Sequence, residues 1–212
     1  TPADTCHPEQ SRMDATSPTY FAHPTAVVDP AARVGKGSKI WHFSHVMAGA
    51  TVGERCNIGQ NVVISPGCSL GNGCKVQNNV SIYTGVTVED DVFLGPSMVF
   101  TNVINPRAFI ERKAEYLATR IARGASIGAN ATIVCGITLG EYCFVGAGAV
   151  VTRDVPPYAT VYGNPARIHG FTCWCGVQLP SDPPPFEGVS RMSCTACGRS
   201  YSREGTRVTA LA

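Results

Sequence analysis

The sequence predicts an all-β protein: a parallel β-helix of about seven stacked coils, with one protruding loop and a small C-terminal extension. Three observations support this prediction. Apolar residues recur every six positions, the recurrence is interrupted once between Thr101 and Arg120, and two pairs of cysteines follow near the C-terminus. These features set the boundaries: an N-terminal arm over 1–19, the β-helix over 20–170 with a loop over 101–120, and an extension over 171–212.

The six-residue repeat defines the β-helix. One frame runs from Ala22 to Phe100 and resumes from Ile121 to Val151, and every position of this frame is apolar. With 44% hydrophobic residues in the chain, chance gives such a run on the order of once in ten million. A period of six fits neither an α-helix nor one long strand, so each hexad is predicted to form a short strand and a turn.

Three hexads close one triangular coil, and coils stack about 4.8 Å apart like neighbouring parallel strands. Four places after each apolar position comes a second small or apolar residue, a series that includes Cys56, Cys68, Cys74 and Cys143. These cysteines are therefore predicted to fill the core. Glycine after the apolar position, and glycine or asparagine near the turn, suit corners that need unusual backbone angles.

Composition excludes several classes of partner. The net charge of +2 gives no overall field that attracts nucleic acid or an anionic membrane. No apolar run approaches the roughly 18 to 20 residues that cross a bilayer, and the first residues lack the apolar stretch of a secretory signal. A cytosolic protein with reduced thiols is therefore expected, and the polar, aperiodic segment 1–18 is predicted to be a flexible arm.

The hexads resemble those of the hexapeptide-repeat acyltransferases, and this resemblance implies a left-handed coil. Longer segments look like the bacterial N-acetyltransferases of UDP-2-acetamido-3-amino-2,3-dideoxyglucuronate. These segments are IWHFSHV (40–46), QNNVSIY (77–83), GPSMVFTNVINPR (95–107), IERK (110–113) and GANATIVCG (128–136). The resemblance covers roughly the range 21–170. It implies acetyl-CoA as co-substrate, a nucleotide-linked amino sugar as acceptor, surface polysaccharide synthesis as context and a homotrimer with active sites between subunits.

The register of the hexads predicts a polar cleft. Every third hexad begins on the same face, at Ile40, Ile58, Val76 and Leu94, and these hexads are expected to stack beside the loop. Substrate-binding candidates follow from this column and from the resemblance: His45, Asn78, Asn79 and Tyr83. Asn79 fits a turn-stabilising role equally well, and His45 fits a structural histidine.

The loop carries the candidate catalytic residue. Many hexapeptide acyltransferases use a histidine base near this loop, but the segment here has none. The resemblance implies that Asn102 orients the sugar amine, and the leaving thiolate of CoA is the candidate proton acceptor. Asn105 is a further substrate-binding candidate, and Arg107, Arg112 and Lys113 are candidate partners for diphosphate or carboxylate, with simple surface solvation as the alternative.

CoA is expected along the later coils, as the superfamily resemblance implies. The candidate contacts are small residues and the segment that closes the coil: Gly128, Gly146, Ala147, Gly148, Asn164, Pro165, Ala166 and Arg167. The last four of these fit a plain coil cap as well.

The cysteines of the extension predict a metal site. Cys173 and Cys175 precede Cys194 and Cys197, and each pair is followed by glycine. This spacing suits a structural, tetrahedral Zn²⁺ in a zinc-ribbon-like fold. Two disulfides, or iron, are the alternatives.

Three other functions remain open at this stage. A dTDP-linked 3-amino-deoxy sugar is the nearest, since Thr84 stands where an acidic residue is expected in close relatives. A metal-dependent enzyme similar to γ-class carbonic anhydrases requires three histidines that this β-helix does not offer at the right spacing. A non-catalytic scaffold leaves the loop unexplained.

Overall fold

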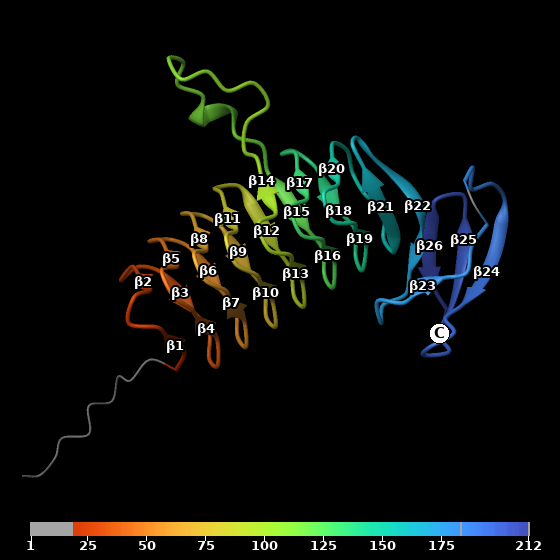
Figure 1. Cartoon of the computed structure of the whole chain (residues 1–212), viewed down its shortest axis with the longest axis horizontal. Helices are drawn as coiled ribbons and strands as arrows, with labels where there is room; N and C mark the ends of the chain where they lie inside the picture. Colours follow the sequence, from red (N-terminus) through yellow and green to blue (C-terminus); the bar gives the residue numbers. More distant parts are fainter. Residues whose placement is uncertain (1–18, 183, 212) are drawn as a thin grey trace, which may run out of the picture.

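The computed structural model describes residues 19–182 and 184–211, and it confirms the predicted left-handed β-helix (Figure 1). The arm predicted over 1–19 lies outside the described residues except for Thr19. Each coil contributes short strands to three parallel sheets, named here sheets A, B and C. Sheet B receives seven strands from the coils, and sheet A receives one from each coil in the same way, so the prediction of about seven coils is confirmed.

The strands follow the hexad frame. Sheet A begins with β1 (Phe21–Ala22), β4 (Lys39–Ile40), β7 (Asn57–Ile58), β10 (Lys75–Val76), β13 (Phe93–Leu94), β16 (Ser126–Ile127) and β19 (Phe144–Val145). Sheet B contains β2 (Val27–Val28), β5 (His45–Val46), β8 (Val63–Ile64), β11 (Ser81–Ile82), β14 (Val99–Phe100), β17 (Thr132–Ile133) and β20 (Val150–Val151). Sheet C contains β3 (Arg33–Val34), β6 (Thr51–Val52), β9 (Ser69–Leu70), β12 (Val86–Val88), β15 (Thr119–Ile121) and β18 (Thr138–Leu139).

The last residue of each strand points into a continuous apolar core. From Ile40 to Val151 the residues of the hexad frame are at most 2% exposed. Ala22 is exposed and Val28 and Val34 are half-buried, because the described residues cover the first coil on one side only. The second predicted series is also buried, and its polar member Ser44 donates its hydroxyl to the Gly59 carbonyl at 2.7 Å.

Glycine occupies two kinds of position in the coils, for different physical reasons. Turn positions have positive φ as predicted, for example Asn61 at 56°. Glycines that follow the apolar position do not. At Gly128 a Cβ atom would lie 2.5 Å from the backbone nitrogen of Ala147 in the next coil. The prediction of unusual angles at these positions is therefore wrong: they are glycine because adjacent coils approach closely there.

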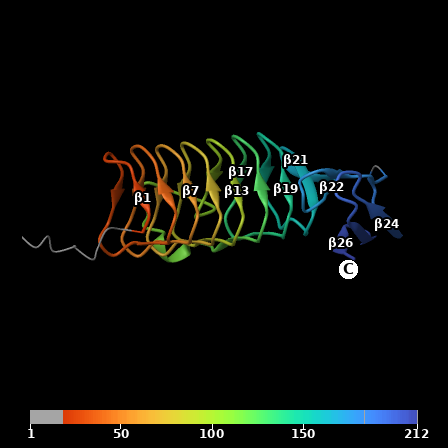
Figure 2. The same ribbon diagram turned by 90° about the horizontal axis from the view of Figure 1, so that it is seen from below.

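The C-terminal end leaves the parallel stack. β21 (Ala159–Gly163) still pairs in parallel with β19, but β22 (Ala166–Thr172) runs antiparallel to β21 and is followed by β23 (Gln178–Leu179). A separate antiparallel sheet follows, formed by β24 (Val189–Ser193), β25 (Ser200–Glu204) and β26 (Arg207–Ala210). Figure 2 shows the coils in a row with this extension at their C-terminal end. Within the described residues no helix has the length and apolar character to span a bilayer.

Candidate active site

The loop leaves the β-helix at the corner between sheets B and C, called here the B/C corner. Thr87 of β12 pairs with Ser69 of the preceding coil and with Arg120 of the following one. The chain from Thr87 to Arg120 is much longer than the chain from Ser69 to Thr87, because the loop is inserted between β14 and β15. The loop projects away from the coils (Figure 1). The expected end of the loop at 120 is slightly too late, because β15 begins at Thr119.

Backbone hydrogen bonds close the neck of the loop. The Leu117 N–H donates to the Asn102 carbonyl at 3.0 Å, and the Thr119 N–H donates to the Gly85 carbonyl at 3.0 Å. The Thr101 hydroxyl accepts the Cys135 N–H at 2.9 Å, which fixes the first loop residue on the next coil. The position of Asn102 is therefore set by the β-helix, although the rest of the loop projects outward.

Asn102 lies at this neck, half-buried, and its side chain has no hydrogen-bond partner among the described residues. Tyr83 and Thr84 precede Thr101 and Asn102 by one coil at the same corner. Tyr83 is 39% exposed, and Thr84 donates its hydroxyl to the Pro66 carbonyl at 2.9 Å. Asn102 and Tyr83 thus lie at the same corner, and the coil repeat places Thr84 one coil before Asn102.

The cations of the loop are not equivalent. Arg112 donates to both oxygens of the Glu115 carboxylate at 2.8 Å, beside the short 3₁₀ segment η1 (Lys113–Glu115). Lys113 lies 3.8 Å from Glu111. Arg107 donates only to the Pro106 carbonyl, at 3.4 Å, and has no carboxylate partner among the described residues. Arg107 is therefore the loop cation with the most uncompensated charge, and the exposed Asn105 lies close before it in the chain.

The predicted polar column lies at a different corner, between sheets A and B, called here the A/B corner. The Gln60 N–H donates to the Asn78 amide oxygen at 2.9 Å, and the Asn61 amide donates to the Asn79 amide oxygen at 3.0 Å. Both Asn78 and Asn79 therefore support turns. A shallow cavity of about 270 Å³ lies at this corner, and it is lined by Trp41, His42, Asn57, Gly59, Gln60, Gln77 and Asn78.

The polar column lies at the A/B corner and the loop at the B/C corner, which are at opposite ends of the sheet B strands. The cleft expected from the sequence is therefore not formed within one chain. His45 also departs from its predicted place. It belongs to β5 of sheet B, three coils before β14, and its Nε2 lies 3.0 Å from Asp29 Oδ1. Hydrogen bonds from His45 and from the Ala48 N–H hold the pKa of Asp29 below its usual range.

The CoA candidates gather along the later part of the A/B corner. Gly128 and Gly146 occupy equivalent positions in successive coils, with Ala147 and Gly148 in the turn that follows. Asn164 and Pro165 form the exposed tip of the β21–β22 hairpin. Ala166, at the start of β22, is only 6% exposed and offers little surface to a ligand.

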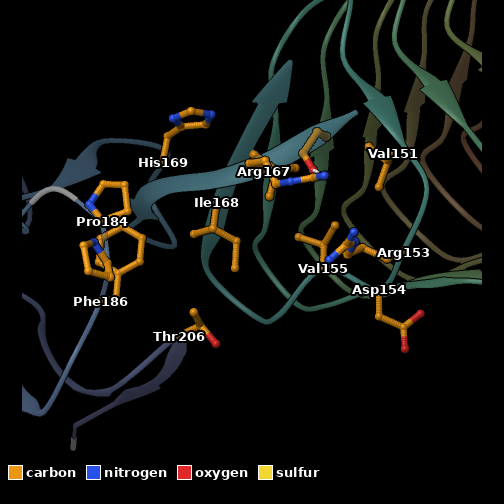
Figure 3. A pocket seen from close by; sticks show the side chains of 13 residues that line it. Val151, Arg153, Asp154, Val155, Arg167, Ile168, His169, Pro184, Phe186 and Thr206 are labelled. Atoms are coloured by element: carbon orange, nitrogen blue, oxygen red, sulfur yellow. Dashed lines mark hydrogen bonds between the residues drawn. The ribbon is translucent and has the colours of Figure 1, made fainter. Parts of the chain in front are cut away.

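A cavity of about 450 Å³ lies between the last coil and the extension. Arg153, Val155 and Arg167 line its coil side, and Pro184 and Phe186 of the extension face them (Figure 3). Arg167 donates to the Ala166 carbonyl at 2.9 Å. Its guanidinium forms no salt bridge with a carboxylate among the described residues.

The four extension cysteines come together as predicted. Their sulfur atoms all lie within 4.8 Å of one another. The Cys197 backbone N–H lowers the pKa of the Cys194 thiol to about 6, whereas burial raises the pKa of Cys173 to about 12. The backbone amides of the glycines serve the turns instead of the sulfurs: Gly176 donates to the Cys173 carbonyl at 2.8 Å and Gly198 to the Cys194 carbonyl at 3.0 Å.

Comparisons with known proteins agree with this architecture. The family model for the bacterial transferase hexapeptide (six repeats) matches residues 31–66 and 118–153, and that for the hexapeptide repeat of succinyl-transferase matches 49–84. A dTDP-3-amino-3,6-dideoxy-alpha-D-galactopyranose 3-N-acetyltransferase of Aneurinibacillus thermoaerophilus is 42% identical over 189 residues, which are 89% of this chain and 94% of that protein. The chain belongs to the hexapeptide-repeat sugar N-acetyltransferases.

Other hexapeptide acetyltransferases match less of the chain. Serine acetyltransferase 2 of Arabidopsis thaliana is 32% identical over 66% of this chain and 31% of its own length. A crystal structure of PerB from Caulobacter crescentus, in complex with CoA and GDP-perosamine, is 25% identical with a TM-score of 0.46, covering 72% of this chain and 58% of that chain. As a member of this family the protein is an acetyl-CoA-dependent sugar N-acetyltransferase.

Proposed function

We propose that the protein transfers the acetyl group of acetyl-CoA to the 3-amino group of a dTDP-linked 3-amino-dideoxyhexose. The 42% identity to a dTDP-3-amino-3,6-dideoxygalactose N-acetyltransferase, over 94% of that protein, carries this proposal. Thr84, one coil before Asn102, supports the dTDP-linked acceptor. It carries a neutral hydroxyl at a position where the resemblance to uronate-specific enzymes predicts an acidic residue.

The second candidate acceptor is UDP-2-acetamido-3-amino-2,3-dideoxyglucuronate. The loop segments FTNVINPR and IERK favour it, and the Arg107 guanidinium, which has no carboxylate partner within residues 19–182 and 184–211, offers a partner for the sugar carboxylate. Lys113 is a further cation along the loop, at 3.8 Å from Glu111. A dTDP-linked deoxy sugar would use the same guanidinium for its diphosphate.

The proposed reaction needs no covalent enzyme intermediate. The Asn102 amide orients the free amine, which attacks the thioester carbonyl; the C–N bond forms, the C–S bond breaks, and the amine proton ends on the departing thiolate of CoA. An amide cannot accept this proton, and the loop segment 101–118 contains no histidine. Asn105 and Tyr83 are proposed to contact the sugar nucleotide from the same corner.

We propose that the active enzyme is a homotrimer. The outward residues of sheet B carry no lysine, arginine or carboxylate: Val27, His45, Val63, Ser81, Val99, Thr132 and Val150. Sheet A presents Lys39 and Lys75 outward, and sheet C presents Arg33 and Arg120. The loop also exposes apolar side chains, with Phe109 85% and Ile104 60% accessible, which a neighbouring protomer would cover.

A threefold arrangement about sheet B brings the two corners together. Three triangular prisms that turn one face to a common axis place the A/B corner of each beside the B/C corner of the next. Asn102 of one protomer then faces the corner that holds Asn78, Asn79, Gly128 and Gly146 in its neighbour. This arrangement puts acetyl-CoA and the sugar nucleotide between subunits. The cytosolic location stays a prediction.

A substrate panel tests the proposal. Release of CoA thiol from acetyl-CoA is measured with dTDP- and UDP-linked 3-amino sugars, with and without a C6 carboxylate, and with the corresponding 3-hydroxy sugars as controls. We expect kcat/KM to be highest for the dTDP-3-amino-dideoxyhexose. A preference for the UDP-uronate establishes the second candidate, and equal thiol release with the 3-hydroxy sugars excludes N-acetylation at this position.

For the extension we propose a separate structural role: Cys173, Cys175, Cys194 and Cys197 hold a Zn²⁺ that takes no part in acetyl transfer.

A further inference from the structure

The sulfur atoms of the extension have the spacing of ligands around one ion. Cys173 and Cys197 are 3.4 Å apart, Cys175 and Cys194 are 3.6 Å apart, and all four sulfurs lie within 4.8 Å. Sulfurs at about 2.3 Å from a tetrahedral zinc are about 3.8 Å from one another, whereas bonded sulfurs are about 2.05 Å apart. The four thiols therefore fit one metal site and not two disulfides.

The donor set selects the kind of metal. Four thiolates in tetrahedral array suit Zn²⁺ or an iron–sulfur centre and disfavour Mg²⁺ and Ca²⁺, which take oxygen ligands. Cys173 and Cys194 are at most 3% exposed, while Cys175 and Cys197 are exposed. The site thus lies at the boundary between the extension and solvent, where a metal can enter. Four protein ligands leave no open position, as in structural zinc sites.

One ligand is connected to the β-helix by a buried tyrosine. The Tyr201 hydroxyl donates to Cys173 Sγ at 3.0 Å and accepts the Trp174 N–H at 3.1 Å. Its ring packs edge-on against Tyr158 at 5.2 Å, and Tyr158 stacks on Tyr142 at 5.5 Å. Three aromatic rings therefore link the metal ligand to turns of the last coils.

The same region covers the end of the apolar core. Phe171 and Leu179 are at most 1% exposed and belong to the core that runs through the coils. Phe171 contacts Phe186 of the extension at 4.9 Å between ring centroids. A stack of repeats needs a terminal cap, because its last repeat has no neighbour to cover it. The segment 171–212 contains no hexads that could supply another coil.

We infer that one Zn²⁺, bound by Cys173, Cys175, Cys194 and Cys197, fastens the extension as the end cap of the β-helix, with Tyr201 as the connection between metal site and coils. The inference rests on the metal site proposed above and adds its role. The metal stabilises the whole fold from this end, because it holds together the two cysteine turns that flank the segment carrying Phe186, and Tyr201 in the strand that follows contacts one of its ligands.

Metal analysis and thermal unfolding of the purified full-length protein test this inference. We expect one zinc per chain by mass spectrometry of the metal content. Removal of the metal by a chelator should lower the Tm by more than about 5 °C, and added Zn²⁺ should restore it. Because this experiment starts from the folded wild-type protein, it does not depend on any variant folding.

Variants separate metal binding from capping. Cys194→Ser should lose zinc and lower the Tm. Tyr201→Phe should retain zinc and still lower the Tm, since its ring remains but its hydrogen bonds to Cys173 and Trp174 are lost. Cys135→Ala, a buried thiol outside the cluster, is the matched control and should keep its zinc.

Two outcomes overturn the inference in distinguishable ways. If the purified protein contains iron or disulfides in place of zinc, both the proposed zinc site and its capping role are wrong. If the protein binds one zinc but its Tm does not change when the zinc is removed, the zinc site is supported and only its capping role is wrong.

Discussion

Asn102 is the residue on which the proposed chemistry depends. Its backbone carbonyl accepts the Leu117 N–H, so the residue is held at the neck of the loop while its amide stays available for a ligand. This arrangement combines a fixed backbone with a polar side chain that has no partner in the described part of the chain, a combination suited to orienting a substrate.

Replacement of Asn102 by alanine should lower kcat by about 10- to 1000-fold, because the amine loses its orienting partner. Acetyl-CoA binding, measured by calorimetry, should change little, since CoA is proposed to lie along the later coils. Asn72→Ala is the matched control: its amide oxygen accepts the Glu54 N–H at a corner away from the loop, and its loss should leave kcat near the wild-type value. Wild-type turnover in Asn102→Ala would remove this residue from the mechanism.

Individual side chains show where sequence reasoning succeeds and where it stops. Every residue of the hexad frame from Ile40 to Val151 is buried, because the six-residue period identifies the side chains that point inward. The predicted polar column does not place His45 correctly, since this residue precedes Val46 in β5 of sheet B and pairs with Asp29 from the preceding coil. Nor does the hexad frame explain Gly128, whose requirement comes from the close approach of the Ala147 backbone in the next coil.

The loop is the element that distinguishes this chain from a bare coil. Its ends are adjacent, joined by the Leu117–Asn102 hydrogen bond, and the coil continues in register on both sides. Its position was predictable to within about two residues because the hexads stop and resume. Its conformation was not, since it has no periodic sequence pattern, and its exposed Phe109 would be covered only in the proposed trimer.

Replacing the segment 103–116 by a tight Asn-Gly turn should leave the fold intact and remove activity. The β-helix needs none of these residues for its ladder, and a shorter loop has a smaller closure cost, so the Tm should change by only a few degrees. Acetyl transfer should fall by more than about 100-fold, since Arg107 and the walls of the site are lost. Circular dichroism monitors the fold; substantial residual activity would show that the loop is dispensable.

At the scale of the whole molecule, the outward positions of sheet B, which carry no lysine, arginine or carboxylate, predict the assembly. Size-exclusion chromatography with light scattering should give three times the 22.4 kDa of one chain. Val99→Arg places a charge on this face, where the wild-type side chain is 46% exposed, and should shift the protein to monomers with loss of activity. Thr51→Arg, on the exposed face of sheet C, should remain trimeric. A monomeric wild-type protein, or a trimeric Val99→Arg variant, contradicts this assembly.

The complete architecture was more predictable than the site, for a physical reason. Coil number and sheet membership follow from a six-residue period repeated along the chain, and the cysteine spacing predicted which thiols meet. The site does not follow from one chain, because its candidate residues divide between two corners, with Asn78 at one and Asn102 at the other.

The reversal of direction at β22 has a consequence for how the protein behaves at high concentration. A parallel ladder that ended with an open, correctly oriented strand would act as a template, and further molecules could lengthen it into a fibre. In sheet A, β22 runs antiparallel to β21 and β23 spans only Gln178–Leu179, so this sheet ends without an open parallel strand onto which the first coil of another molecule could add.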